Sequence, residues 1–473
     1  MRREDSTFIV LILLTLSYQV VCRAKSQEQL SKNIHMPSGD LEDLANLSKI
    51  YGSKKGFVEK NIKANEANNL GSNPYFPYTP ITGYIDIYNE GNSMFYWLSP
   101  ARENPDKAPV IIWLEGGPGG SSVNSLFWFL GPLEVKNYPE EKKARIRKIS
   151  WNQKANIIFP DYPLGTGFST NTENHIARTR KDIEDQMLRF YQGFLEKHPE
   201  FKGREIYVAG ESFGGHSVPY TAHALKYSDN PDINLKGIFI SSGMIYGVDF
   251  FGSYPEFALL NKNYTKITKL EYEEMSKRRD VCVHLIKRGH NKFHQYNGFL
   301  ACELLYYVKF LMSTGAKNKK FNPLYMKGDF KFNFNSDLFL NSTGVKQYLK
   351  VRKDNYDSNN ITFLFNLCPD GFRRNSSPLI GQLLDDGVRT VVIDGTEDFI
   401  CNYQQEEKSI DDMDWSGKES WSKAARKPCQ YGLCKEYKNL KQIRVPGSGH
   451  GISIYKPEFG LEIINTLMFG DQK

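Results

Sequence analysis

The chain has 473 residues, of which 40% are hydrophobic and 24% charged, so it is long enough for one large domain or for about two or three ordinary ones. This composition is typical of a globular protein and excludes a collagen, a disordered chain and a protein with many membrane spans. The net charge of +7 is spread along the chain without arginine blocks or zinc-finger spacing, so we do not expect nucleic acid as a partner.

The first residues, 1–24, are predicted to be a cleaved signal peptide. Arg2 and Arg3 precede an apolar stretch over Phe8–Val21, and the small residue Ala24 is followed by polar sequence. The alternative is a membrane anchor, but about 14 apolar residues are fewer than the roughly 20 that a spanning helix needs. We therefore expect export through the secretory pathway, a final location outside the cell or in a lysosomal or vacuolar lumen, and no membrane span in the mature chain.

A polar segment over residues 25–73 is interpreted as a leader or propeptide, because it is rich in Asn, Lys and Ser and has little apolar periodicity. From about Gly83, short apolar runs alternate with helical stretches such as Asp182–Lys197, whose apolar residues share one face. The alternation predicts a mostly parallel α/β sheet flanked by helices. The predicted strands are Val110–Leu114, Asn156–Phe159, Ile206–Ala209, Gly237–Ile240, Arg389–Ile393 and Gln442–Val445.

The alternation of predicted strands and helices is absent over residues 245–338, which are rich in Lys, Asn and Tyr. Amphipathic helical pieces are expected here at Lys269–Arg279 and Phe299–Leu311. We interpret this segment as a helical lid inserted over the sheet. The core is then formed by residues 74–244 and 339–473.

A histidine cluster in the predicted lid is a candidate metal site. Cys282, His284, His290 and His294 lie close together in the sequence, and the last two are one helical turn apart, as zinc ligands sometimes are. No glutamate accompanies the two histidines in an H-E-x-x-H arrangement, and an oxidising compartment favours a disulfide at Cys282. We therefore expect no bound metal.

A nucleophile elbow is predicted where the strand that ends at Ala209 meets the sequence Gly-Glu-Ser-Phe-Gly at residues 210–214. Glycines on both sides of Ser212 let the backbone turn tightly and lift the hydroxyl clear of the sheet. A helix expected from about Ser217 would direct its N-terminus toward developing negative charge. The motif alone is weak evidence for a nucleophile elbow, and the predicted strand before it provides most of the support.

A serine nucleophile needs a histidine that takes its proton and a carboxylate that orients the histidine. Asp398 lies just beyond the fifth predicted strand and His450 just beyond the sixth, so the order Ser212, Asp398, His450 is that of α/β hydrolases. A turn acid beside Glu397 and an exposed loop histidine are the alternatives. The position of Asp398 and His450 at the carboxyl ends of strands favours a catalytic triad, because parallel sheets assemble their sites there.

A glycine-rich loop follows the first predicted strand and runs from Glu115 to Ser122. We expect the N–H groups of Gly117 and Phe213 to form the oxyanion hole that stabilises the tetrahedral intermediate. The alternatives are a phosphate-binding loop and a simple turn, but neither Gly-Lys-Ser/Thr nor Gly-x-Gly-x-x-Gly is present.

Five segments together closely resemble the serine carboxypeptidases, including their vitellogenic carboxypeptidase-like branch: WLEGGPGGSS, SWNQKANIIFPDYPLGTGFS, VAGESFGGHSVPY, DGTEDFICNY and VPGSGH. The resemblance covers about residues Ile81 to Phe469. It implies an α/β-hydrolase fold with an inserted lid, and release of single residues from the C-termini of peptides and proteins, best in acid. No metal, nucleotide or redox cofactor is expected, because acyl transfer to serine and then to water uses only the groups above.

The resemblance also implies how the terminal carboxylate of a peptide is held. The family uses an Asn or Gln in the glycine loop, the glutamate before the nucleophile, and a further glutamate just before a Gly-Pro. Glu211 matches the second, whereas Glu115 and Phe129 stand at the first and third. We hypothesise that Glu115 and Glu211, with Gly116, bind the carboxylate by sharing one proton at low pH. The alternative hypothesis is that this chain no longer recognises the terminal carboxylate of a peptide.

The cysteines are assigned by the same resemblance. Cys401 stands where the family often carries an unpaired thiol lining the site, and Gly120 replaces a common loop cysteine, which leaves Cys368 without its usual partner. The remaining pairs implied are Cys282 with Cys302 and Cys429 with Cys434.

Two other functions stay open at this point. One is acyl transfer to an alcohol, which plant relatives of this scaffold perform, and the other is a binding protein whose hydrolase site has decayed. A homodimer is the candidate assembly.

Overall fold

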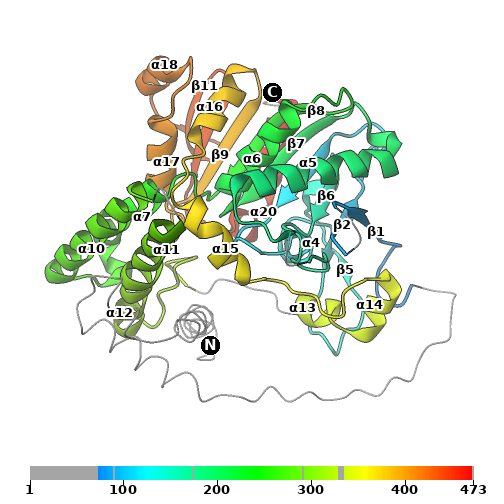
Figure 1. Cartoon of the computed structure of the whole chain (residues 1–473), viewed down its shortest axis with the longest axis horizontal. Coiled ribbons are helices and arrows are strands. Elements are labelled where there is room, and N and C mark those ends of the chain that lie inside the picture. Colours follow the sequence, from blue (N-terminus) through cyan, green and yellow to red (C-terminus); the bar gives the residue numbers. More distant parts are fainter. Residues whose placement is uncertain (1–72, 89–90, 173–174, 290–291, 329–334, 471–473) are drawn as a thin grey trace.

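The computed structural model describes residues 73–88, 91–172, 175–289, 292–328 and 335–470. The predicted signal peptide and almost all of the polar leader lie outside these residues. In Figure 1 a large twisted sheet occupies the centre of the molecule, and helices cover both of its faces.

The central sheet is built from ten strands of the described chain. They are β1 (Ile81–Asp86), β2 (Ser93–Ser99), β3 (Val110–Leu114), β6 (Asn156–Pro160), β7 (Glu205–Glu211), β8 (Asn234–Ser241), β9 (Arg389–Gly395), β10 (Lys427–Cys429), β11 (Gly432–Tyr437) and β12 (Leu440–Val445). Their order is β1-β2-β6-β3-β7-β8-β9-β12-β11-β10, with parallel pairing from β6 to β12 and antiparallel pairs toward both edges. The prediction of a mostly parallel sheet is confirmed, and all six predicted strands are present.

Successive side chains of a strand point to opposite faces, and here both faces are covered. On β3, Ile112 and Leu114 pack in one hydrophobic cluster, whereas Ile111 and Trp113 pack in the other. All five β3 residues are buried. A strand covered on both faces needs apolar residues at every position, which explains why these strands read as continuous apolar runs.

Three helices cover the first face of the sheet and two cover the second. The first set is α5 (Arg180–Lys197), α6 (Gly214–Lys226) and α16 (Ser377–Asp385), and the second is α4 (Ser122–Trp128) and α20 (Pro457–Phe469). The α5 helix begins two residues before the predicted Asp182, because Thr179 caps it: the Asp182 N–H donates to the Thr179 hydroxyl at 3.4 Å, and the Thr179 N–H donates to Asp182 at 2.9 Å.

A group of helices lies beside the sheet at one end of the molecule, where the lid is predicted (Figure 1). The elements are α7 (Gly247–Gly252), α8 (Tyr254–Leu260), α9 (Lys262–Thr265), α10 (Lys269–Lys287), α11 (Lys292–Leu300), the π-helix η4 (Ala301–Val308) and α12 (Lys309–Lys317). The Cys282–Cys302 disulfide joins α10 to η4. The predicted helix at Lys269 thus extends beyond Arg279, and the one predicted near Phe299 belongs to three consecutive elements. The outer limits of the lid stay a prediction.

The remaining elements connect the sheet, its covering helices and the edge hairpin. They are η1 (Trp151–Gln153), η3 (Pro199–Phe201), the pair β4 (Leu133–Glu134) and β5 (Arg145–Ile146), and the helices α13 (Asn335–Leu340), α14 (Thr343–Leu349), α15 (Thr362–Gly371), α17 (Tyr403–Asp411), α18 (Lys418–Lys423) and α19 (Ile452–Tyr455).

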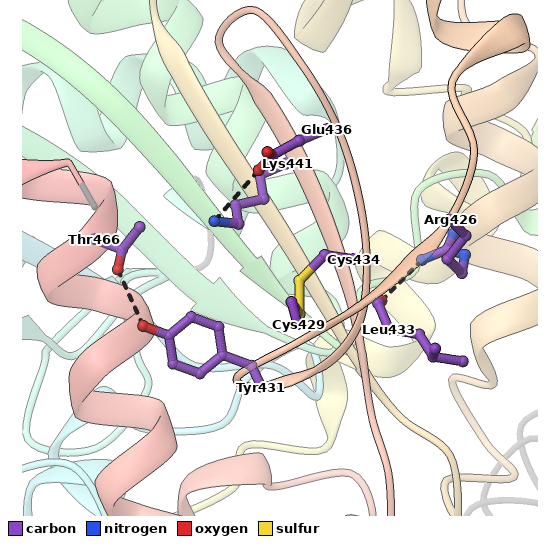
Figure 2. The surroundings of a disulfide bond; sticks show 8 residues. All are labelled: Arg426, Cys429, Tyr431, Leu433, Cys434, Glu436, Lys441 and Thr466. Carbon is purple, nitrogen blue, oxygen red and sulfur yellow. Dashed lines mark hydrogen bonds and ion pairs between the residues drawn. A yellow bond between two sulfur atoms is a disulfide. The ribbon is translucent and has the colours of Figure 1, made fainter. Parts of the chain in front are cut away.

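The hairpin of β10 and β11 closes one edge of the sheet, and Figure 2 shows its disulfide between Cys429 and Cys434. The Tyr431 hydroxyl lies 3.3 Å from the Thr466 hydroxyl, so the hairpin is tied to α20 (Figure 2). Both predicted disulfides are therefore present. Within the described ranges, no helix is long and apolar enough to cross a membrane.

Candidate active site

The predicted nucleophile sits at a sharp turn between β7 and α6. Ser212 has a φ of 62°, a left-handed conformation that non-glycine residues rarely adopt. Its N–H donates to the Ser241 carbonyl at 3.1 Å, and its carbonyl accepts from the Met244 N–H at 2.8 Å. The strained backbone is thus held from both sides. The helix begins at Gly214 and not near Ser217, so its N-terminus lies directly beside the nucleophile.

The glycine loop touches this turn. A Cβ placed on Gly116 would lie 2.4 Å from the Ser212 Cβ and 3.0 Å from its hydroxyl oxygen. These distances are shorter than van der Waals contact, so only glycine allows this approach. The β3 strand, which carries the loop, pairs in parallel with β7, which carries the serine. Adjacent parallel strands therefore bring Gly116 and Ser212 together.

Asp398 and His450 meet because their strands are also neighbours. β9 and β12 pair in parallel, with Gly395 opposite Val445. Beyond them, His450 Nδ1 lies 2.7 Å from Asp398 Oδ2. The other carboxylate oxygen of Asp398 accepts from the Cys401 N–H at 3.1 Å. This fully buried carboxylate can hold the imidazole in one tautomer and one orientation.

The surroundings of the Ser212 hydroxyl, the predicted nucleophile, include the Cys401 thiol. Within the described residues, no hydrogen bond joins the Ser212 hydroxyl to His450, and the hydroxyl lies beside the Cys401 thiol. Burial raises the pKa of Cys401 well above its ordinary value, an effect that the neighbouring Asp398 reinforces and the Ser212 hydroxyl opposes. The thiol is therefore protonated and a poor nucleophile.

The two amides predicted for the oxyanion hole are those of Gly117 and Phe213. Neither N–H donates to a protein acceptor among the described residues. The loop itself is held in place, because the Gly120 N–H donates to the Gly116 carbonyl at 2.9 Å and the Asn360 N–H donates to the Gly119 carbonyl at 2.8 Å. The segment around Asn360 was not singled out from the sequence, since nothing in its own residues indicates this contact.

Glu115 and Glu211 are two carboxyl groups that act on each other electrostatically. The Glu115 carboxyl accepts from the Gly116 N–H at 3.1 Å, from Trp113 Nε1 at 3.4 Å and from the Ser125 hydroxyl. Burial still raises its pKa above the ordinary value, because these bonds and the nearby His450 only partly offset the loss of solvent.

Glu211 is 5% exposed, and within the described part of the chain its carboxyl makes no hydrogen bond. Burial, then the Glu115 carboxylate, then Asp398 raise the pKa of Glu211 well above its ordinary value. Phe129, at the position of the missing family glutamate, is buried and packs edge-on against Trp113 with 6.2 Å between ring centres. Glu115 and Glu211 therefore interact as two carboxyl groups, and a buried apolar ring stands where the third family glutamate would be.

A second carboxyl pair lies beneath Asp398 and was missed from the sequence. Asp394, near the end of β9, and Glu406 of α17 are both fully buried and interact electrostatically, and neither Asp394 carboxylate oxygen has a hydrogen-bond partner among the described residues. Burial raises the pKa of Asp394 to about 7. Burial and Asp394 raise that of Glu406, although the Gly243 N–H donates to Glu406 at 3.0 Å. An acidic residue inside an apolar strand was the available signal.

Cys282, the cysteine of the candidate metal cluster, is bonded to Cys302 and is not available as a metal ligand. His290 lies outside the described residues. Within the described ranges, no group of three or more His, Cys, Asp or Glu residues is placed to hold a metal ion. Cys368 and Cys401 are both free thiols, as the sequence predicts.

The sheet order, the elbow and the three converging loops define an α/β hydrolase with a serine nucleophile. The model of the serine carboxypeptidase family matches residues 71–470. Serine carboxypeptidase-like 48 of Arabidopsis thaliana is 29% identical over 404 residues, which is 82% of this chain and 78% of that protein. Serine carboxypeptidase 3 of Hordeum vulgare is 29% identical over 409 residues, which is 83% of this chain and 78% of that protein.

Among solved structures, Kex1Δp, a prohormone-processing carboxypeptidase from Saccharomyces cerevisiae, is similar in fold. Its TM-score is 0.69 at 22% identity, over 82% of this chain and 91% of that one. The α/β-hydrolase fold predicted from the sequence is therefore confirmed.

The chain belongs to the serine carboxypeptidase family, because the family model spans most of its length. It is a serine-type carboxypeptidase, a hydrolase of peptide bonds, as predicted. The acyltransferase and decayed binding-protein alternatives are not favoured. The finer likeness to vitellogenic carboxypeptidase-like proteins stays a prediction.

Proposed function

We propose that Ser212, His450 and Asp398 remove single residues from peptide C-termini through an acyl-enzyme, most efficiently at acidic pH. The observation that carries this assignment is the 2.7 Å contact between His450 Nδ1 and Asp398 Oδ2 at the loops beyond β9 and β12. It leaves Nε2 of the imidazole to accept the serine proton.

In the first half-reaction, the Ser212 oxygen bonds to the scissile carbonyl carbon and its proton passes to His450. The N–H groups of Gly117 and Phe213 stabilise the negative charge that develops on the carbonyl oxygen. The peptide bond then breaks as His450 gives the proton to the departing amine, which leaves as a free amino acid. In the second half-reaction, water repeats the attack on the acyl-enzyme, and Ser212 recovers its proton.

The departing residue carries a carboxylate, and we infer that Glu115, Glu211 and the Gly116 backbone bind it. Two ionised carboxylates side by side would repel a third, but a pair that shares one proton can donate a hydrogen bond to it. The burial of Glu211 without a hydrogen-bond partner supports this assignment. The same pair accounts for an acidic optimum, because deprotonation converts a donor into a repelling charge.

Labelling by a fluorophosphonate probe tests the nucleophile. We expect stoichiometric labelling of the wild-type chain and none of Ser212→Ala, together with loss of hydrolysis of N-blocked dipeptides by about 10⁴-fold or more. The Cys401→Ala variant is the control, because its thiol lies beside the serine but is not a reactant. Labelling that persists in Ser212→Ala, or that disappears in Cys401→Ala, would contradict the assignment.

We infer a location in the secretory pathway, outside the cell or in an acidic lumen. The Cys282–Cys302 and Cys429–Cys434 disulfides support this location, because such bonds persist in oxidising compartments. Peptide and protein C-termini are the proposed substrates, and a homodimer stays the candidate assembly.

A further inference from the structure

A buried glutamate in the helical insertion has no role in the chemistry described above. Glu303 lies on η4 with only 8% of its surface exposed, and among the described residues its carboxyl forms no hydrogen bond and no ion pair. Burying an unpaired carboxylate costs free energy and contributes nothing to folding. Such a group is a candidate for ligand binding.

Glu303 sits between two aromatic residues on one helical face. Phe299 and Tyr307 are four residues before and after it, about one turn away in each direction. Phe299 packs against Phe365 and Phe372 at α15, with ring centres 5.5 Å and 5.8 Å apart. One side of the Glu303 position is therefore the wall made by α15.

The α15 helix also contacts the residue next to the nucleophile. A Cβ on Gly371, the last residue of α15, would lie 3.0 Å from the Phe213 ring. Phe213 follows Ser212 directly, and its N–H is one of the two oxyanion donors proposed above. The face of η4 that carries Glu303 thus packs on a helix that contacts the elbow itself.

The opposite wall reaches the aspartate of the triad. Tyr307 stacks on Tyr254 with ring centres 5.0 Å apart, and Tyr254 stacks in turn on Phe399 at 5.3 Å. The Tyr254 hydroxyl donates to the Ile400 carbonyl at 2.9 Å. Phe399 and Ile400 connect Asp398 to Cys401, so this second wall ends beside the Ser212 hydroxyl.

Among the described residues, the groups that interact electrostatically with the Glu303 carboxylate carry no positive charge. Besides burial, this carboxylate is one of the causes that raise the pKa of Tyr254, of Tyr307 and of the Cys368 thiol. The Tyr307 hydroxyl is itself buried without a hydrogen-bond partner. On the neighbouring helix α10, Arg278 donates to the Leu305 carbonyl and Arg279 pairs with Glu256. Within the part of the chain that the structure describes, no cation therefore pairs with Glu303.

We propose that Glu303 is a specificity-determining residue that binds the ammonium or guanidinium group of a substrate Lys or Arg, at the residue that contributes the scissile carbonyl. This inference rests on the proposed function. The departing residue is assigned to the side of Glu115 and Glu211, whereas the residues that flank Glu303 connect to Phe213 and Phe399 on the other side of Ser212. Aromatic walls suit the long apolar stems of Lys and Arg, and the carboxylate suits their charged ends.

Two series of blocked dipeptides test the inference. In the first, the departing residue is always Ala and the residue before it is Lys, Leu or Glu; in the second, the first residue is always Leu and the departing residue is Lys or Ala. At about pH 8, where Glu303 is ionised, we expect Glu303→Gln to lower the Lys/Leu ratio of kcat/KM in the first series by about 10- to 100-fold, because a charged hydrogen bond is lost. The value for Leu-Ala should change by less than about threefold.

Charge reversal sharpens the test. The Glu303→Lys variant should prefer Glu-Ala to Lys-Ala. The matched control is Glu273→Gln, which removes an exposed carboxylate from α10 in the same insertion and should leave every ratio unchanged. Glu303→Leu provides a second neutral variant in case the amide folds poorly, and it should lower the Lys/Leu ratio at least as far.

The pH dependence of the ratio gives an independent readout. Burial raises the pKa of Glu303 to about 7, so the carboxyl gains its charge as pH rises through neutrality. The wild-type Lys/Leu ratio should therefore increase between about pH 5 and about pH 8, and that of Glu303→Gln should stay flat. Both substrates share the same departing residue, so any titration of Glu115 and Glu211 cancels in the ratio.

The outcomes separate this inference from the proposed function. A Lys/Leu ratio that is unchanged in Glu303→Gln and Glu303→Leu, in enzymes that still cleave Leu-Ala, overturns the role of Glu303 alone. A change confined to the second series overturns the assignment to the acyl side. Failure of the wild-type enzyme to cleave any blocked dipeptide, with no labelling of Ser212, overturns the proposed function itself.

Discussion

The shared proton of Glu115 and Glu211 makes a prediction about pH that a single substitution can test. Glu115→Gln replaces one carboxyl by an amide of nearly the same shape, whose NH2 group donates a hydrogen bond at every pH. The variant also returns the glycine loop to the type of residue that the family carries there. We expect it to extend hydrolysis of free-acid peptides to higher pH.

The size of the effect follows from counting charges. Below the titration of the pair, Glu115 and Glu211 carry one negative charge and one proton, and they can bind a carboxylate. Above it they carry two charges, and only the fraction of enzyme that retains the proton is active, so kcat/KM should fall about tenfold per pH unit. In Glu115→Gln, Glu211 is the only carboxyl of the pair, so the pair never carries more than one negative charge. About two units above the midpoint, the variant should therefore exceed the wild type by about 100-fold on free-acid substrates.

The predicted pH dependence agrees with the environment of Glu211. Burial and the neighbouring Glu115 raise the pKa of Glu211, so its proton is retained beyond the ordinary range of a glutamate. Removing the Glu115 charge removes one of those causes, and the pKa of Glu211 should fall in the variant.

The assay compares one blocked dipeptide as a free acid and as its C-terminal amide, across the pH range of stable enzyme. The amide lacks the terminal carboxylate and otherwise meets the same catalytic groups, so the ratio of the two substrates isolates the pair. Glu140→Gln, an exposed carboxylate, is the control and should follow the wild type. Identical pH profiles for the acid and the amide in the wild type would refute the shared-proton reasoning, as would a ratio that Glu115→Gln leaves unchanged.

Two further predictions concern residues that support the site, namely Gly116 in the glycine loop and the buried Asp394–Glu406 pair. Gly116→Ala should lower kcat/KM by about 10²-fold or more with little change in KM, because its methyl group would lie 2.4 Å from the Ser212 Cβ; an active variant would contradict the close approach. The Asp394–Glu406 pair binds an extra proton in the folded state, so stability should be greatest in acid and decline by about 2–4 kcal/mol as pH rises toward 7. Unfolding by urea should show a smaller pH slope for Glu406→Gln, and equal slopes would refute the extra proton.

Much of the core was predictable because its signals are local. A strand buried on both faces requires an apolar run, and β3 and β9 could be recognised from their own residues. The elbow is also local, since Ser212 needs a tight turn between a strand and a helix. Helix starts were less accurate: α5 begins early because Thr179 and Asp182 form a capping box, and α6 begins directly after the turn.

The antiparallel edges of the sheet were not predicted. β1, β10 and β11 are partly exposed, and their sequences lack the continuous apolar runs that mark the central strands. Pairing of such strands depends on which neighbour is available at the edge, a property of the assembled sheet.

The sequence by itself determined the six central strands, the elbow at Ser212 and the identity of the three triad candidates, because each depends on residues within a few positions of one another. Only the tertiary structure decided which carboxyl groups are buried and what they face. Asp394 interrupts an apolar strand and Glu303 looks like an ordinary acidic residue, but neither sequence context shows what the carboxyl faces. Their environments are made by α15, α8 and α17, which lie far away along the chain, and the solvation and charge that set the chemistry of a carboxyl group depend on those distant neighbours.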